Sequence, residues 1–379
     1  MLIPIAAAVF TLATLLLALL WRGWLALRRR PAPGFWRRTA LWHLGLFALH
    51  VLATVPIALG VLASRFVGTR GDEAGYNGPR MAEDGSWQPQ SRESLAAEHP
   101  RGEAVETPAA PSLFEVRFTA RDAVGLRGYL VPPEQPGEPR FSAILVHGLY
   151  RSALEIEDPG RMLRDLGGEA LLLEMRNHGG SDRARPTFGL DESLDVLAAV
   201  EWMRSRPDAA DRPLVLFAVS LGTAAAALAA PGIPGLAALV LDAPMESLRG
   251  TAERMVSRFP ADVPVLSRYW RSAILWSAGR LGGLPLDAVD PRANLARLSP
   301  QVRVLMIGAG DDWRMPPESV RALFESLPTD PERKELWIEP AATHGKVWVA
   351  APDEYRARLR TLIDSVVAPT EEPAEPAVE

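Results

Sequence analysis

The stretch FAVSLGTAAAA, residues 217–227, places a serine between two segments of opposite character. Pro213–Phe217 before it is an apolar run rich in β-forming residues, and the alanines after it favour a helix. Small residues, Ala218 and Gly222, stand two positions before and after Ser220. Two interpretations are open at this point. The serine is either a nucleophile on a strained strand-to-helix turn or a residue that caps the helix N-terminus.

Short, largely apolar runs recur on both sides of this stretch, as is typical of strands buried on both faces of a sheet. These runs are Ala143–Val146, Ala170–Leu173, Leu214–Ala218, Ala237–Leu241, Val302–Ile307 and Glu335–Ile338. Residues 112–133 alternate around a turn at Asp122 to Gly125, which predicts a β-hairpin. Apolar stripes at helical spacing separate later runs, and they consist of Leu190, Leu194, Leu197, Val200 and Met203 in one case and Tyr355, Leu359, Leu362 and Val366 in the other. The alternation predicts an α/β fold with a mostly parallel sheet covered by helices on both faces.

Glycines or polar, reactive residues follow five of the predicted strands. The segments that follow them are His147–Tyr150, Glu174–Asp182, Ser220, Gly308–Glu318 and Glu339–Lys346. The carboxyl ends of parallel strands meet at one edge of a sheet, which is where α/β proteins place their chemistry. Turn formation alone does not require this coincidence, so the pattern favours a functional site at that edge.

In order and spacing these segments resemble the α/β-hydrolase fold serine hydrolases. The resemblance covers about residues 113–367, and its matching pieces are LVHGLYRS (145–152), LLLEMRNHGGSD (171–182), FAVSLGTAAAALAA (217–230), LVLDAPMESL (239–248), GAGDDWRMPPE (308–318) and ATHGKVWVAAPDEYRARL (342–359). The nearest likeness is to a membrane-anchored, esterase- or peptidase-like branch of bacterial hydrolases. The family usually has Gly where Ala218 stands, although Ala is a tolerated variant.

The resemblance favours Ser220 as a nucleophile on the strained turn rather than a helix cap. A serine hydroxyl needs a base to take its proton. Of the six histidines only His344 follows Ser220 in the chain, and it comes directly after the last predicted strand. This fold uses the chain order Ser, acid, His, so we expect His344 to act as general base and then as general acid. The family's loops imply structural roles for His147 and His178.

Two aspartates fit the carboxylate that orients the histidine. Counted from Gly308, the family spacing favours Asp311, whereas counted back from Pro316 it favours Asp312. The sequence leaves both open. The transition state of acyl transfer carries an oxyanion that needs N–H donors. By resemblance these donors are the backbone amides of Leu149 and Leu221.

The N-terminal part of the chain has an unusual charge pattern. Residues 1–70 contain eight Arg and no Asp or Glu, so they carry +8 and residues 71–379 carry −13. Leu2–Leu20 is an uncharged apolar run about 28 Å long as a helix, and Thr39–Ser64 is a second apolar run. The six Arg between the runs favour the cytoplasmic side, and Arg after the first run argues against a cleaved signal peptide. We therefore expect a multi-pass membrane protein with two transmembrane helices and a body outside the cytoplasm.

The predicted organisation is a transmembrane hairpin over residues 1–67, a polar linker over 68–111, a catalytic domain over 112–368 and a disordered tail over 369–379. A cap-like insertion at about 244–300 contains Tyr269, Trp270 and Trp276, which line an acyl pocket, touch a membrane or pack as ordinary helix contacts. The absence of cysteine excludes disulfides and thiolate chemistry. The body lacks the clustered Lys and Arg of nucleic-acid-binding proteins.

Together these features predict a membrane-anchored serine hydrolase that cleaves a carboxylic ester, lipid esters and thioesters included, through an acyl-enzyme on Ser220. The expected partners are a small-molecule or lipid ester and a bilayer, with no nucleic acid, no metal and no organic cofactor. Two alternatives remain. One is a peptidase or acyltransferase that uses the same residues, and the other is a non-catalytic membrane scaffold of hydrolase fold.

Overall fold

The computed structural model describes residues 16, 19–24, 34–66, 80–81, 87–88, 114–133, 138–149, 151, 153–258 and 264–367. The chain divides into two compact units. The first consists of residues 1–69 and 252–286, and the second of residues 70–251 and 287–379. The middle of the predicted cap-like insertion therefore belongs to the same unit as the N-terminal helices.

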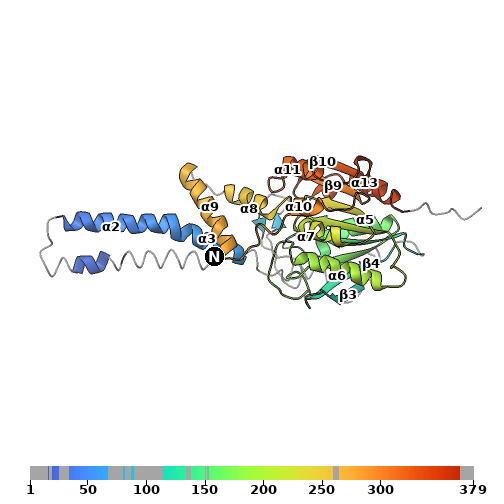
Figure 1. Ribbon diagram of the computed structural model, residues 1–379, viewed down its shortest axis with the longest axis horizontal. Coiled ribbons are helices and arrows are strands. Elements are labelled where there is room, and N and C mark those ends of the chain that lie inside the picture. The colour runs from blue at the N-terminus through green and yellow to red at the C-terminus, as the bar shows by residue number, and fades with distance from the viewer. Residues whose placement is uncertain are drawn as a thin grey trace, which may run out of the picture. The chain divides into compact units, whose positions relative to one another are not determined.

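The short apolar runs form the strands of one eight-stranded sheet in the second unit (Figure 1). In spatial order the strands are β10-β9-β8-β7-β5-β6-β4-β3. Their bounds are β3 Phe114–Thr119, β4 Gly125–Val131, β5 Phe141–Val146, β6 Gly168–Glu174, β7 Leu214–Val219, β8 Leu236–Asp242, β9 Arg303–Asp311 and β10 Lys334–Thr343. Neighbours from β10 to β6 pair in parallel, whereas β4 pairs antiparallel with both β6 and β3. The predicted hairpin and the mostly parallel sheet are confirmed.

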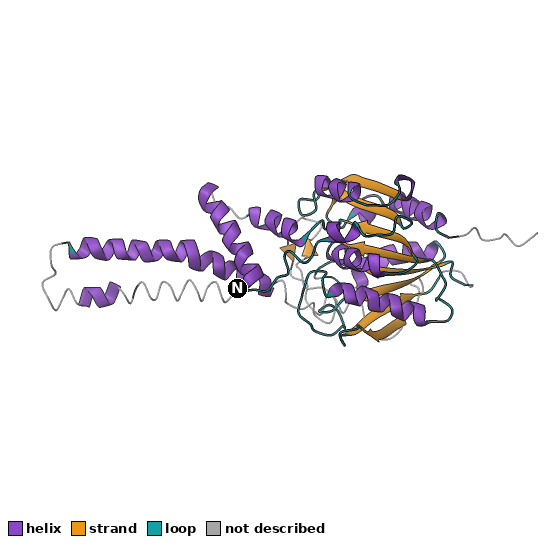
Figure 2. Cartoon of the chain, in the orientation of Figure 1, coloured by secondary structure: helices purple, strands orange, loops and turns teal. Residues whose placement is uncertain are grey.

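Helices separate the strands along the chain and pack against the sheet (Figure 2). The α-helices whose residues lie in or begin in the second unit are α5 Glu157–Asp165, α6 Glu192–Ser205, α7 Leu221–Ala229, α8 Leu248–Ser257, α10 Pro291–Leu295, α11 Pro317–Glu325, α12 Val347–Ala350 and α13 Pro352–Asp364. Short 3₁₀ turns are η2 Ala153–Ile156, η3 Ala230–Gly232 and η4 Pro331–Arg333.

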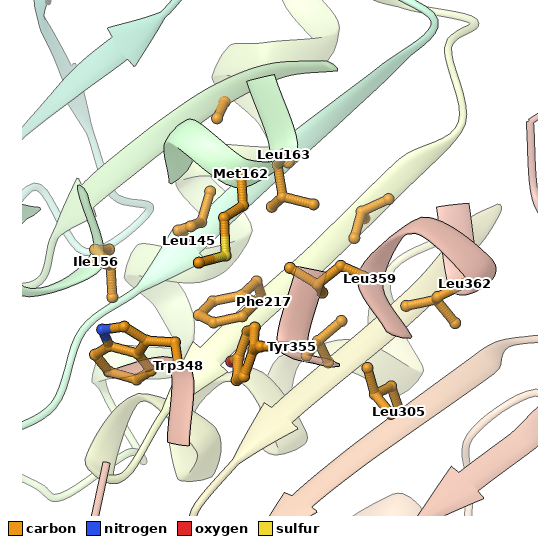
Figure 3. Packing of buried hydrophobic residues seen from close by; sticks show 14 of the residues in the cluster. Leu145, Ile156, Met162, Leu163, Phe217, Leu305, Trp348, Tyr355, Leu359 and Leu362 are labelled. Carbon is orange, nitrogen blue, oxygen red and sulfur yellow. The ribbon is translucent and has the colours of Figure 1, made fainter. Parts of the chain in front are cut away.

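A large apolar core of the described residues lies on one face of the sheet (Figure 3). Every second residue of the central strands contributes to it, for example Leu145 and Phe217, together with Leu163 of α5 and Tyr355 and Leu359 of α13. Alternate side chains of a strand point to opposite faces. The residues between these core members are also fully buried, among them Ile144, Leu171, Leu216 and Leu239. Both faces of the sheet are therefore covered, as the unbroken apolar runs predict.

Helix α6 buries Val200 and Met203 of the predicted apolar stripe, together with an acidic side that the stripe does not predict. Leu194 and Leu197 are only half-buried, whereas Glu192 and Asp195 are buried. The Asp195 carboxylate accepts hydrogen bonds from the backbone N–H and the guanidinium of the fully buried Arg176. The acidic side of the helix can face inward because the Arg176 donors bond to the Asp195 carboxylate, which compensates the cost of burying both charges. Hydropathy alone does not predict such a pairing.

The first unit contains helices α2 Phe35–Leu49, α3 Val55–Phe66 and α9 Pro264–Arg280, with a π-helical turn η1 at His50–Thr54 between α2 and α3. Helix α3 packs closely on α9. A Cβ at Gly60 would lie only 2.0 Å from Ser277 Oγ and 2.3 Å from the Ile274 carbonyl oxygen. The glycine therefore lets the two helix backbones approach closely.

The prediction of transmembrane helices is wrong for the part of the chain that can be assessed. Within the described ranges, no helix combines the length and the apolarity needed to cross a membrane. In the second predicted span, Thr39–Ser64, the π-helical turn His50–Thr54 joins α2 of 15 residues to α3 of 12 residues. Helix α3 packs on α9 through the side that carries the buried Pro56 and Gly60. The predicted multi-pass membrane location, with the body outside the cytoplasm, depended on these spans, and that prediction is wrong as well.

Other N- and C-terminal predictions concern residues that the structure largely leaves out. The first apolar run, Leu2–Leu20, lies outside the described residues except for residues 16, 19 and 20, and the tail 369–379 lies wholly outside them. Within the predicted linker 68–111, β1 Arg80–Met81 and β2 Trp87–Gln88 pair in antiparallel fashion. The remainder of that linker is not among the described residues.

Candidate active site

Ser220 occupies a strained turn between β7 and α7. Its backbone has φ 51° and ψ −117°, a conformation that residues with a side chain rarely adopt. The Ser220 N–H donates to the Asp242 carbonyl oxygen at 2.9 Å, and the Ser220 carbonyl accepts the Thr223 N–H at 2.9 Å. Thr223 Oγ1 in turn accepts the Met245 N–H at 3.0 Å. Hydrogen bonds on both sides of Ser220 therefore hold the turn in its unfavourable conformation.

Close packing around Ser220 leaves space only for small residues at positions 218 and 222. A Cβ at Gly222 would lie 2.6 Å from the carbonyl oxygens of both Val146 and His147. Contacts this short do not occur in folded proteins, so only glycine fits beside the end of β5. Ala218 on the other side is fully buried in the sheet. The first turn of α7 is thus pressed against the loop that follows β5.

Ser220, His344 and Asp312 form a continuous chain of hydrogen bonds. The Ser220 Oγ to His344 Nε2 distance is 2.8 Å, and the His344 Nδ1 to Asp312 Oδ2 distance is 2.6 Å. His344 comes directly after β10, and Asp312 comes directly after β9, so two neighbouring strand ends bring them together. The Asp312 side chain is fully buried and that of His344 is 17% exposed. The arrangement lets a proton pass from the hydroxyl to an imidazole whose cation is stabilised by a carboxylate.

The two candidate aspartates lie in different environments. Asp311 is the last residue of β9 and is exposed to solvent. Asp312 turns inward, and its second oxygen, Oδ1, accepts the N–H groups of Arg314 and Met315 at 2.9 and 3.1 Å. Among the described residues, Asp312 is the one of the two aspartates whose side chain bonds to His344.

The two predicted oxyanion donors, Leu149 and Leu221, belong to the loop after β5 and to the start of α7. Leu221 is the first residue of α7, where a backbone N–H has no partner within its own helix. Leu149 follows Gly148, and a Cβ placed on Gly148 would be 3.4 Å from Ser220 Cβ. The loop after β5 therefore passes beside the Ser220 side chain, close enough to offer its amide to an atom bound there.

His147 and His178 are buried and contact each other edge to face, with ring centroids 4.7 Å apart. His147 Nε2 accepts the Met175 N–H at 3.2 Å, so its proton resides on Nδ1, 2.7 Å from the Gly148 carbonyl oxygen. Burial holds the pKa of His147 well below its ordinary value, and the neighbouring His178 lowers it further. Burial also lowers the pKa of His178. Both rings are therefore neutral supports of the loop.

Asp242, at the end of β8, is a buried carboxyl group that the sequence analysis did not identify as part of the site. Asp242 lies beside Val219 in the sheet, and its Oδ2 accepts the Tyr355 hydroxyl at 2.9 Å. Burial raises the pKa of Asp242 to about 7, and the negative charges of Glu155 and Asp312 add to the rise against the Tyr355 hydrogen bond. The sequence contains only a weak signal for it, an Asp directly after a buried strand in LVLDAP.

The aromatic residues of the insertion belong to the first unit, whereas Ser220, His344 and Asp312 belong to the second. Tyr269 and Trp276 are 47% and 55% exposed. Their part in an acyl pocket stays a prediction. Among the residues that the structure describes, no three His, Asp or Glu side chains gather in a way that could hold a metal ion.

The order of the eight strands and the strained serine turn define an α/β-hydrolase fold. The model of the alpha/beta hydrolase family matches residues 143–373, more than half of the chain. The chain therefore belongs to the alpha/beta hydrolase family. The predicted membrane-anchored branch of that family finds no support in the described helices.

Solved structures share this fold. An esterase from Pyrococcus furiosus is 20% identical at a TM-score of 0.57, and the match covers 71% of this chain and 97% of that one. GrgF, an alpha/beta hydrolase from Penicillium, is 20% identical at a TM-score of 0.51, with 67% and 99% covered. Est1E from Butyrivibrio proteoclasticus, whose structure holds ferulic acid, is 16% identical at a TM-score of 0.50, with 66% and 99% covered. At these identities the likeness shows the fold alone.

Proposed function

We propose that this protein is a serine esterase that hydrolyses a small-molecule carboxylic ester through an acyl-enzyme on Ser220. The observation that carries the proposal is the hydrogen-bonded chain from Ser220 Oγ through the His344 ring to the buried Asp312 carboxylate. The positive φ of Ser220 adds support, since strain of this kind persists mainly where function requires it. The esterase from Pyrococcus furiosus, which shares the fold, is consistent with this reaction class.

The reaction begins when His344 Nε2 takes the Ser220 proton as Oγ bonds to the ester carbonyl carbon. The carbonyl oxygen becomes an oxyanion, which the N–H groups of Leu149 and Leu221 stabilise. Asp312 holds the His344 ring in position and stabilises its positive charge. The carbon–oxygen bond to the leaving group then breaks, and His344 gives its proton to the departing alcohol.

Deacylation repeats these steps with water. His344 takes a proton from water, the hydroxide oxygen bonds to the acyl carbon, and the same two amides hold the second oxyanion. The bond to Ser220 Oγ breaks, the proton returns from His344 to Oγ, and the free acid leaves. The protein ends each cycle unchanged.

The test is hydrolysis of a panel of p-nitrophenyl esters by the wild type and by Ser220→Ala, with Ser326→Ala as the matched control. Ser326 directly follows α11, and its hydroxyl donates to the Leu323 carbonyl oxygen. We expect turnover by the wild type and the control, and loss of at least about 10³-fold in Ser220→Ala. Peptide anilides cleaved faster than esters, or acyl transfer to added alcohols in place of water, would redirect the proposal to a peptidase or acyltransferase. If the wild type turns over none of these substrates, the proposal is contradicted.

A further inference from the structure

Glu155 is a buried carboxylate beside the candidate active site that the proposed chemistry does not use. It lies in η2, and only 13% of its side chain is exposed. A carboxylate is costly to bury unless hydrogen bonds and opposite charge compensate it. Burial raises the pKa of Glu155, whereas Arg151, the Gly148 N–H, Lys346 and His344 act in the opposite direction. The group therefore interacts with the loop after β5 and with the histidine of the site.

The two oxygens of Glu155 bind the chain on the two sides of Leu149. Oε2 accepts the Gly148 N–H at 2.7 Å, and Oε1 lies 3.1 Å from Arg151 Nε. Hydrogen bonds with a charged partner are shorter and stronger than neutral ones. The carboxylate thus ties the residue before Leu149 to a side chain two residues after it. The amide of Leu149 lies within the segment that is fixed in this way.

Gly148 separates the carboxylate from the nucleophile. A Cβ on Gly148 would lie 3.1 Å from Glu155 Oε2 and 3.4 Å from Ser220 Cβ. The loop is therefore held between the two side chains with little free space. A shift of Gly148 toward or away from Glu155 changes the distance between the Leu149 amide and an oxyanion bound at Ser220.

From these contacts we infer that Glu155 is a positioning residue that fixes the loop carrying the Leu149 N–H, and so sets the geometry of the oxyanion site. The inference rests on the proposed esterase function. The contact that fixes Gly148 requires an acceptor oxygen at the right reach, because it is a hydrogen bond to Oε2, whereas only the contact of Oε1 with Arg151 depends on the negative charge. The oxyanion itself gains nothing from a nearby negative charge.

The test compares four variants by kcat and KM for the best p-nitrophenyl ester. Glu155→Ala removes the acceptor, Glu155→Asp shortens its reach by one methylene, and Glu155→Gln keeps an acceptor oxygen at full reach. Glu157→Ala is the matched control, because Glu157 forms an ion pair with Arg161 at the same spacing and is 17% exposed. Circular dichroism and thermal unfolding establish that each variant is folded.

We expect kcat to fall on the order of 10- to 100-fold in Glu155→Ala and Glu155→Asp with KM little changed, since a misplaced donor weakens only the transition state. Glu155→Gln should recover most of this loss, and Glu157→Ala should match the wild type. Wild-type kcat in both Glu155→Ala and Glu155→Asp, or equal losses in Glu155→Ala and Glu157→Ala, would overturn the inference. If Glu155→Ala does not fold, the contrast between Glu155→Asp and Glu155→Gln decides.

The experiments distinguish an error in the role of Glu155 from an error in the proposed function. A wild type that is active through Ser220 but insensitive to the acceptor at position 155 overturns only the role of Glu155. A wild type without esterase turnover, or one whose turnover survives Ser220→Ala, overturns the proposed function and the inference that depends on it.

Discussion

Replacing Asp242 by Asn should remove a loss of stability that the protein suffers as pH rises from about 4 to about 7. The folded-state pKa of Asp242 is about 7, whereas the ordinary value is 3.8, chiefly because the side chain is fully buried. As pH rises above 3.8 the unfolded chain ionises this group while the folded chain keeps it protonated, so ionisation favours unfolding. The stability penalty grows until pH reaches about 7 and then levels off at about 4 kcal/mol.

Part of this penalty is already present at mildly acidic pH, so the change between pH 5 and pH 8 amounts to about 3 kcal/mol. Asn is nearly isosteric and neutral, and its carbonyl oxygen can accept the Tyr355 hydroxyl that Asp242 accepts now. The free energy of unfolding of Asp242→Asn relative to the wild type should therefore rise by about 3 kcal/mol from pH 5 to pH 8.

The assay is urea unfolding followed by tryptophan fluorescence at several pH values for both proteins. Asp353→Asn is the matched control, because Asp353 is an exposed aspartate on α13, two residues before Tyr355. Other titrating groups contribute equally to the wild type and the variant, so they cancel in the difference. A difference between Asp242→Asn and the wild type that stays constant from pH 5 to pH 8 would refute the reasoning.

Two further changes test the site and the turn that supports it. Asp312→Asn should lower kcat for ester hydrolysis on the order of 10³-fold or more, since the His344 ring loses the carboxylate that orients it, whereas Asp311→Asn should stay near the wild type. Equal losses in the two variants would contradict the assignment. Gly222→Ala should destabilise the protein by about 1–3 kcal/mol, because its Cβ would lie 2.6 Å from two carbonyl oxygens. Thermal unfolding measures this change, and an unchanged melting temperature would show that the turn relaxes.

The sheet and its strand ends could be predicted because strands that are buried on both faces consist of unbroken apolar runs in the sequence. Runs such as 214–218 contain no polar residue, and glycine or a reactive side chain follows them. The pairing of Ser220 with His344 followed from chain order within the resembled family. The structure shows where the two aspartates lie, which spacing does not give. The last residue of β9 is Asp311, and the inward turn begins at Asp312.

The prediction of a membrane span over Thr39–Ser64 failed for a physical reason that α3 illustrates. An apolar helix can bury its side chains in lipid or against another helix, and both environments select the same residue types. Helix α3 packs on α9, whose sequence contains three arginines and lies more than 200 residues further along the chain. The close approach at Gly60 and the π-helical turn at His50–Thr54 are likewise features of packing that hydropathy does not encode.

The sequence analysis also did not identify the acidic residues that lie inside the protein near the site. Composition places carboxylates at the surface, and Asp242 is compensated by Tyr355, which lies 113 residues away in the sequence. Glu155 takes a backbone N–H as its partner, and such a contact has no residue signature. Both groups become visible only when the strand ends are assembled in space.

The central claim is that the Ser220 hydroxyl, activated through His344 and Asp312, becomes the acylated atom. The most direct measurement is mass spectrometry of the protein quenched during turnover of a slowly deacylating ester, followed by peptide mapping. The account predicts one acyl group on the peptide that contains Ser220, and its absence in Ser220→Ala. An acyl group on another residue, or sustained hydrolysis with no acyl group on the protein, would contradict it.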